Sequence, residues 1–120
     1  MSRNRAVIVA IAVLIVVVAF GVIVYTQVGR GGGQARSVDV NVSGTTMTPD
    51  RINVRQNDQV TMNVTADRKE EIHIHGYDIA FEVGAAGDTV QRTFKADRTG
   101  TFEIEIEDTG IPLGELVVSP

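Results

Sequence analysis

The residues best suited to chemistry in this chain are its two histidines, which are spaced two apart. They lie in the segment Ile72-His73-Ile74-His75-Gly76, and the 120 residues include no cysteine. In an extended strand, residues i and i+2 point to the same face, roughly 7 Å apart along the backbone. Two imidazoles placed in this way can reach one metal ion, and imidazole suits copper and zinc. The lack of cysteine excludes disulfides, thiolate catalysis and sulfur-ligated copper or iron clusters.

A two-histidine site needs further donors, and carboxylates are the natural complement for Cu(II) or Zn(II). The acids that could supply an oxygen to His73 and His75 are Asp78, Glu105, Glu107 and Asp108. The same segment also supports a second interpretation, because burial of Ile72 and Ile74 would leave both histidines on a solvated face. The glutamates would then be an ordinary charged surface that protects the sheet from aggregation. Both interpretations stay open on this pattern alone.

Strands must position these side chains, because apolar and polar residues alternate through most of the chain after residue 37. Phe102, Ile104 and Ile106, for example, alternate with glutamates. Glycine, asparagine and aspartate clusters separate the alternating runs, as expected for turns. We expect eight strands, near residues 38–43, 51–55, 59–65, 70–75, 78–83, 88–95, 101–107 and 114–118. The fold class is therefore predicted to be all-β, with short strands in an antiparallel sandwich or barrel.

The start of the chain has a different character. Residues 6–25 are uncharged and mostly Val, Ile, Ala or Leu, and as a helix they would span about 30 Å, the thickness of a hydrocarbon core. No small-residue cleavage pattern follows the run, which favours a retained signal anchor over a cleaved leader. Arg3 and Arg5 favour a cytoplasmic N-terminus. We expect a cytoplasmic segment at 1–5, a transmembrane signal anchor at 6–28, a Gly-rich linker at 29–36 and an extracytoplasmic domain at 37–120.

The charge of the two parts limits the partners. Residues 1–36 carry four arginines and no acid, whereas residues 37–120 carry fifteen acids against seven bases. An acidic domain does not bind nucleic acid by neutralising phosphates, so nucleic acid is excluded as a partner. No acid–histidine–nucleophile set stands out, so we do not expect an enzyme. The expected partners are the membrane, through a single-pass anchor, and a metal ion; the sequence identifies no protein partner.

Five short motifs follow one another across residues 47–118 in a characteristic order. They are Pro49-Asp50-Arg51-Ile52-Asn53-Val54, Asn57-Asp58-Gln59-Val60, His75-Gly76-Tyr77-Asp78-Ile79, Gly100-Thr101-Phe102-Glu103-Ile104 and Gly114-Glu115-Leu116-Val117-Val118. This series resembles the cupredoxin superfamily, in particular the EfeO-type single-domain cupredoxin-like modules. The resemblance implies a cupredoxin-like Greek-key β-sandwich, here preceded by one N-terminal transmembrane helix.

The chain departs from that family at its chemistry. The resemblance implies that His75 holds the first copper-ligand position, facing inward toward Ile106, which stands where a blue-copper protein has cysteine. The loop 107–113 has neither the second histidine nor the methionine of a type 1 copper site. A blue-copper electron carrier is therefore not expected. We expect copper or zinc binding and handling through His73 and His75, or alternatively a metal-free structural or protein-interaction sandwich.

Overall fold

A computed structural model describes residues 33–120, and the predicted segments at 1–5 and 6–28 lie outside these residues. All regular secondary structure within 33–120 is β-strand, which confirms the all-β prediction. No helix that could span a membrane occurs in this part of the chain.

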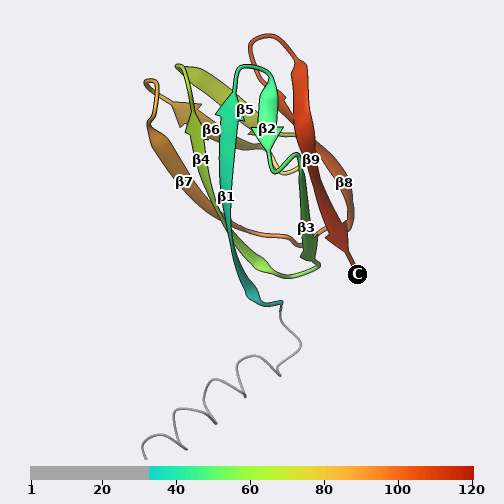
Figure 1. Cartoon of the computed structure of the whole chain (residues 1–120). Helices are drawn as coiled ribbons and strands as arrows, with labels where there is room; N and C mark the ends of the chain where they lie inside the picture. Colours follow the sequence, from blue (N-terminus) through green and yellow to red (C-terminus); the bar gives the residue numbers. More distant parts are fainter. Residues whose placement is uncertain (1–32) are drawn as a thin grey trace, which may run out of the picture. The chain divides into compact units, whose positions relative to one another are not determined.

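Nine strands in residues 33–120 form a two-layer sandwich (Figure 1). They are β1 (Ala35–Ser43), β2 (Thr46–Thr48), β3 (Arg51–Arg55), β4 (Gln59–Ala66), β5 (Glu70–Ile74), β6 (Ile79–Val83), β7 (Thr89–Lys95), β8 (Gly100–Ile106) and β9 (Ile111–Ser119). One sheet has the order β2-β1-β4-β7 and the other the order β3-β9-β8-β5-β6. Two pairs, β1 with β4 and β3 with β9, are parallel, because the chain passes through the other sheet between them.

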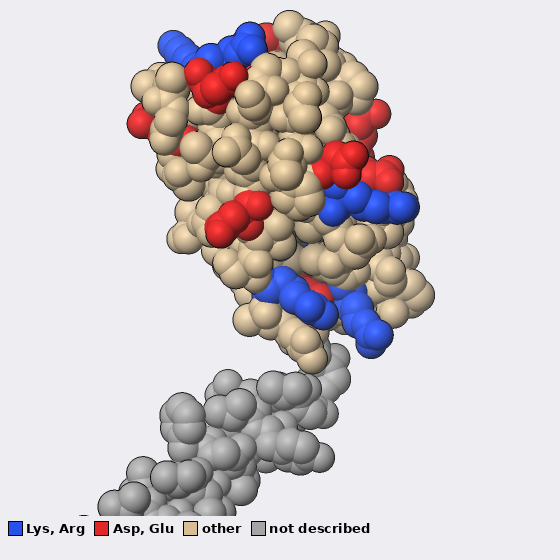
Figure 2. Space-filling view, in the orientation of Figure 1, with Lys and Arg blue, Asp and Glu red and all other residues tan. Residues whose placement is uncertain are grey.

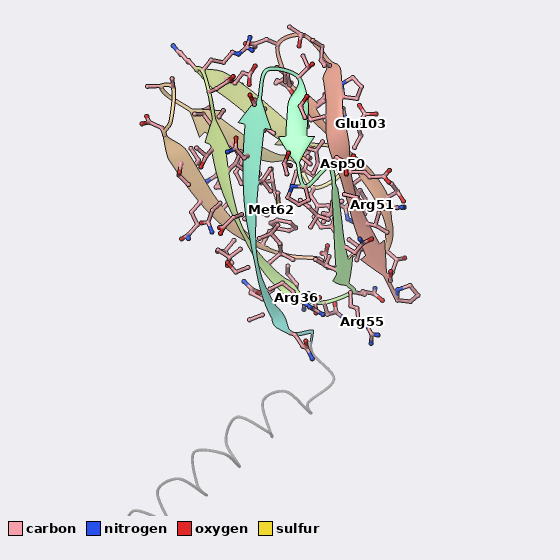
Figure 3. The ribbon with its side chains drawn as sticks, viewed as in Figure 1. Arg36, Asp50, Arg51, Arg55, Met62 and Glu103 are labelled. Atoms are coloured by element: carbon pink, nitrogen blue, oxygen red, sulfur yellow. The ribbon has the colours of Figure 1, made fainter. Side chains whose placement is uncertain are left out.

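The core lies between the two sheets and follows the predicted alternation. On β4, for instance, Val60, Met62 and Val64 are buried while the residues between them face outward. Figure 3 labels Met62 between the two layers. The period of two places every second side chain of β5 and β8 in this core. The intervening side chains of those two strands therefore lie on the outer face of the five-stranded sheet.

The domain begins earlier than residue 37. Strand β1 starts at Ala35, so it includes the last two residues of the predicted linker. The buried carboxylate of Asp58 explains this start: it accepts hydrogen bonds from the backbone N–H of Gln34 at 2.7 Å and of Arg55 at 2.9 Å. It also accepts one from Nε of Arg36 at 3.3 Å. A buried charge needs such partners, so the chain is held in place from Gln34 onward.

The same contacts set the ionisation of Asp58. Burial alone would raise the pKa of this carboxyl. The hydrogen bonds from the Arg55 and Gln34 backbone, together with the Arg36 guanidinium, outweigh burial and hold the pKa below its ordinary value. Basic side chains gather at this end of the domain in Figure 2, and Figure 3 labels Arg36 and Arg55 there.

All eight predicted strands are present, within a few residues of their expected ends. The sequence missed β2, because three residues are too few to show alternation. It also placed the start of β9 at 114 rather than at Ile111. Pro112 and Gly114 interrupt the pattern there, and Leu113 is an extra residue in the β8–β9 register, which forms a β-bulge.

Candidate metal centre

The pairing of β5 with β8 places a histidine directly opposite a glutamate. His73 is the register partner of Glu105, between the two buried pairs Ile72–Ile106 and Ile74–Ile104. Both His73 and Glu105 therefore point to the outer face of the five-stranded sheet, with 20% and 13% of their side chains exposed. The neighbouring β-branched isoleucines favour the extended backbone that fixes these directions.

His75 follows the last residue of β5 and continues the same alternation. Its backbone N–H donates to the carbonyl of Glu103 at 2.9 Å, which keeps it beside β8. Its ring lies 5.1 Å from that of His73, centroid to centroid, at an interplanar angle of 71°. The alternation of the sequence had indicated this outward direction for both rings.

Three donor side chains meet at this point. One ligand atom each of His73, His75 and Glu105 lies within 4.8 Å of the others. Nε2 of His75 is in contact with Oε1 of Glu105. Two imidazoles and one carboxylate can bind an ion such as zinc and leave a further position for water or another ligand. The arrangement can therefore hold a metal ion at the surface of the sheet.

The two ring nitrogens of His73 face two different carboxylates. Its Nε2 is 3.9 Å from Oδ1 of Asp78, whose side chain is 97% exposed. Its Nδ1 is 3.3 Å from Oε2 of Glu107, but the geometry is not that of a hydrogen bond, and Nδ1 is buried with no hydrogen-bond partner. Histidines that bind metals commonly donate their second ring N–H to a carboxylate. Glu107 is placed for that role.

The four predicted oxygen donors differ in their distance from the histidines. Glu105 belongs to the three-residue group, and Glu107 and Asp78 lie within 4 Å of His73. Asp108 is exposed in the turn between β8 and β9 and is not a member of the group. Sequence reasoning named all four acids but had no means of ranking them, since the ranking depends on cross-strand register.

The position that the family resemblance implied for His75 is wrong in this structure. Ile106 pairs with Ile72, so His75 lies near the opposite end of the β5–β8 pair. The His75 side chain is 52% exposed and does not face inward. The physical reason is that the alternation of β5 carries on to His75, the first residue after the strand, and the left-handed backbone comes only at Gly76, which has a φ of 83°.

A cluster beyond Gly76 holds the chain that follows His75. The ring of Tyr77 packs edge-on against Phe102 with centroids 4.7 Å apart. The Tyr77 hydroxyl donates to the carbonyl of Arg98 at 2.8 Å and accepts from its backbone N–H at 3.0 Å. The Arg98 guanidinium lies 4.8 Å from the Tyr77 ring centroid and donates to the carbonyl of Gly76. No signal in the sequence pointed to this role for Arg98.

Acidic residues surround the candidate site on the same face. Glu71 is directly opposite Glu82 on β6, and Glu103 is directly opposite Glu115 on β9. Arg51 Nε partly neutralises the second pair, at 3.2 Å from Oε1 of Glu115. Like charges directly opposite each other destabilise a sheet. A cation bound on this face would reduce that repulsion.

Comparison with known proteins finds similar structures but no match to a family model or a curated protein. The multicopper oxidase mgLAC is 24% identical over 72% of this chain, with a TM-score of 0.55. The match covers 39% of the mgLAC chain, so this chain spans about two fifths of that oxidase.

Two smaller proteins match over most of their own length. The metal-binding domain of the Cu(I)-exporting P-type ATPase CopA of Streptococcus pneumoniae D39, solved with Cu(I), is 12% identical over 70% of this chain and 85% of its own, with a TM-score of 0.60. Auracyanin of the photosynthetic bacterium Roseiflexus castenholzii is 13% identical over 75% of this chain and 100% of its own, with a TM-score of 0.56. Residues 33–120 therefore have a cupredoxin-like fold.

Proposed function

We propose that this protein is a membrane-anchored, extracytoplasmic metal-binding protein that handles copper or zinc through His73, His75 and Glu105. The observation that carries the proposal is the convergence of their three ligand atoms within 4.8 Å. The buried and unpartnered Nδ1 of His73 supports it, because such nitrogens normally have a partner. A carboxylate lies 3.3 Å from that nitrogen without being hydrogen-bonded to it, close enough to give the outer support typical of metal sites once an ion is bound.

The choice of copper or zinc follows from the donor atoms. Imidazole suits both ions, and a carboxylate is an accepted third ligand for zinc. Copper gains further support from the similar fold of a copper-binding protein solved in its apo form. That likeness concerns the fold alone, and titration with each ion identifies the metal.

Electron transfer of the blue-copper kind and enzymatic catalysis are not part of the proposal. Ile106 is buried where the family resemblance expects the copper-binding cysteine, and the chain has no cysteine elsewhere. The closer assignment to EfeO-type modules rests on the sequence motifs at residues 47–118. A non-catalytic binding role fits a site of three donors on an open sheet face.

The membrane anchor is proposed from the sequence. Residues 6–25 form an uncharged run of the length that crosses a bilayer, with Arg3 and Arg5 on its N-terminal side. The protein would then be single-pass, with residues 33–120 outside the cell membrane. Membrane fractions washed with alkaline carbonate should retain the full-length chain, and its release by that wash would contradict the anchor.

One observation favours a metal-free interaction or scaffold domain as the second candidate. Nε2 of His75 already contacts the carboxylate of Glu105. A histidine that is hydrogen-bonded to a glutamate on a sheet surface needs no ion. In that case the acidic face would contribute to solubility or to binding of a protein partner.

Calorimetric titration separates the two candidates. The full-length chain in detergent is titrated with Cu(II) and with Zn(II), and the titrations are repeated with His73→Ala and His75→Ala. We expect one ion per chain, with binding lost in both variants. Glu71→Gln is the matched control, because Glu71 lies on the same face outside the three-residue group. Absence of binding by the unchanged protein, with its fold intact, would leave the metal-free candidate.

A further inference from the structure

We infer that the site formed by His73, His75 and Glu105 takes a divalent ion, Cu(II) or Zn(II), and discriminates against Cu(I). The inference rests on the proposed function and specifies the class of ion. It begins from the donor atoms, which are two imidazole nitrogens and one carboxylate oxygen. Cu(I) is a soft ion that selects thiolate and thioether sulfur, whereas nitrogen and oxygen donors suit the divalent ions.

The sulfur atoms of the described domain lie away from this site. Its two methionines, Met47 and Met62, are buried, with 3% and 1% of their surface exposed. They belong to β2 and β4 of the other sheet and contribute to the core between the layers. His73 and Glu105 point to the opposite side of the five-stranded sheet. Neither thioether can therefore join the two histidines without disruption of the sandwich.

The surrounding charge also favours the higher oxidation state. Carboxylates of Glu107 and Asp78 lie 3.3 Å and 3.9 Å from the two ring nitrogens of His73. A carboxylate that accepts the second ring N–H makes the imidazole a stronger donor. The Coulomb attraction of these anions for an ion is proportional to its charge, so it is twice as large for a divalent ion as for Cu(I).

The exposure of the site indicates that the ion is exchangeable. The side chain of His75 is 52% exposed, and Asp78 lies in the turn before β6 with its side chain 97% exposed. A structural zinc site is closed by four protein ligands, whereas here three donors leave at least one position open to water or to an incoming ligand. The core residues beneath the site, Ile72 and Ile104, are buried independently of any ion. The ion can therefore enter and leave a folded domain.

The test compares three ions on the full-length chain. Cu(II) and Zn(II) are titrated by calorimetry in a weakly coordinating buffer, and Cu(I) is offered without oxygen as its complex with bicinchoninate. We expect one divalent ion per chain, with nitrogen hyperfine structure from imidazole in the Cu(II) electron paramagnetic resonance spectrum. We expect no removal of Cu(I) from the chelator. Failure to bind any of the three ions would overturn the proposed function, whereas retention of Cu(I) as tight as that of Cu(II) would overturn only the present inference.

A substitution that adds sulfur makes the test sharper. Glu105→Met places a thioether opposite His73, and Glu105→Gln is the matched control of similar length without sulfur. If the donor set determines the selectivity, Glu105→Met should withdraw Cu(I) from the chelator and lose Zn(II). Glu105→Gln should lose Zn(II) without gaining Cu(I). Equal behaviour of the two variants toward Cu(I) would contradict the inference.

Discussion

His73 and Glu105 occupy directly opposite positions on β5 and β8, on the side of the sheet that faces away from the core. The pairs on either side of them, Ile72–Ile106 and Ile74–Ile104, are buried between the layers. A single strand register therefore fixes the core contacts and the donor geometry together. Because both donors lie on paired strands, their separation depends on backbone hydrogen bonds rather than on a loop.

Replacement of Glu107 by glutamine should weaken metal binding without removing a ligand. In the proposed metal-bound state, the carboxylate 3.3 Å from Nδ1 of His73 would accept the ring N–H, orient the ring and increase its basicity. Loss of such an outer partner costs about 10- to 100-fold in affinity. Calorimetry with Zn(II) or Cu(II) measures the change, and the melting temperature of the apo protein should stay nearly constant. Asp108→Asn is the control, since Asp108 is exposed and outside the group; an equal effect of the two variants would refute the role of Glu107.

Gly76 and Gly87 form a matched pair for a test of the cluster after His75. Both have a left-handed backbone, with φ of 83° and 84°. An added Cβ would come 2.7 Å from Cδ1 of Phe102 at Gly76 but would meet nothing within 4 Å at Gly87. Gly87→Ala should therefore cost about 1–2 kcal/mol from backbone strain alone. Gly76→Ala should cost a further 1–3 kcal/mol or so from overpacking.

Urea denaturation of the two alanine variants gives the comparison. The Gly76 variant should also bind metal more weakly, because any shift of Phe102 moves the chain next to His75. Similar unfolding free energies for both variants would show that the contact with Phe102 is unimportant.

Asp58 should make the stability of the domain depend on acid pH. Its folded-state pKa is held below the ordinary value of 3.8, so in acid the unfolded chain binds a proton more readily than the folded chain. The stabilisation from this carboxylate is therefore fully present above the ordinary value and is lost as the pH falls through the folded-state pKa. Urea denaturation of the protein and of Asp58→Asn should differ at pH 6, and the difference should shrink as the pH falls below 3.8. A constant difference across that range would contradict this assignment.

The start of the β-sandwich domain can be tested by truncation. A chain that begins at Ser37 lacks the Gln34 N–H and the Arg36 guanidinium, both of which donate hydrogen bonds to the Asp58 carboxylate. Removal of partners from a buried charged group costs about 1–3 kcal/mol, so this chain should be less stable by at least that amount. A chain that begins at Gly33 keeps both partners and provides the control. Equal denaturation midpoints would show that these residues do not support the domain.

Metal removal should lower the melting temperature without unfolding the domain. An ion that binds only the folded state at 100 times its dissociation constant stabilises it by about 2.7 kcal/mol. Addition of EDTA should return the melting curve to that of the apo protein, with its β-sheet circular dichroism unchanged. Unfolding on chelation at 25 °C would instead indicate that the fold depends on the ion.

Alternation in the sequence was sufficient to predict eight of the nine strands in residues 33–120 and the faces of their side chains. The burial of Ile72 and Ile74 and the outward direction of His73 both follow from the period of two. Turn residues located the ends of most strands. Glycine and asparagine mark those positions because they adopt a left-handed backbone at low cost, as Asn57 does with a φ of 71°.

Cross-strand register was beyond the reach of the sequence. The choice of Glu105 rather than Asp108 as the partner of the histidines depends on which residues of β5 and β8 lie opposite each other. That alignment is set by long-range packing of the buried pairs Ile72–Ile106 and Ile74–Ile104, which no local pattern reveals. The implied inward direction of His75 was wrong for a different reason, because the alternation of β5 carries on to that residue.

The alternation along β5 and β8 places the core residues on one side of these strands and the candidate metal donors on the other. Ile72, Ile74 and Ile104 maintain the fold from one side, and the donor residues stand on the other. Surface substitutions of this kind usually change stability by less than about 0.5 kcal/mol. Point mutations could therefore add, exchange or erase the donors over evolutionary time while the sandwich persists. In this domain the donor set can therefore change without a change of fold.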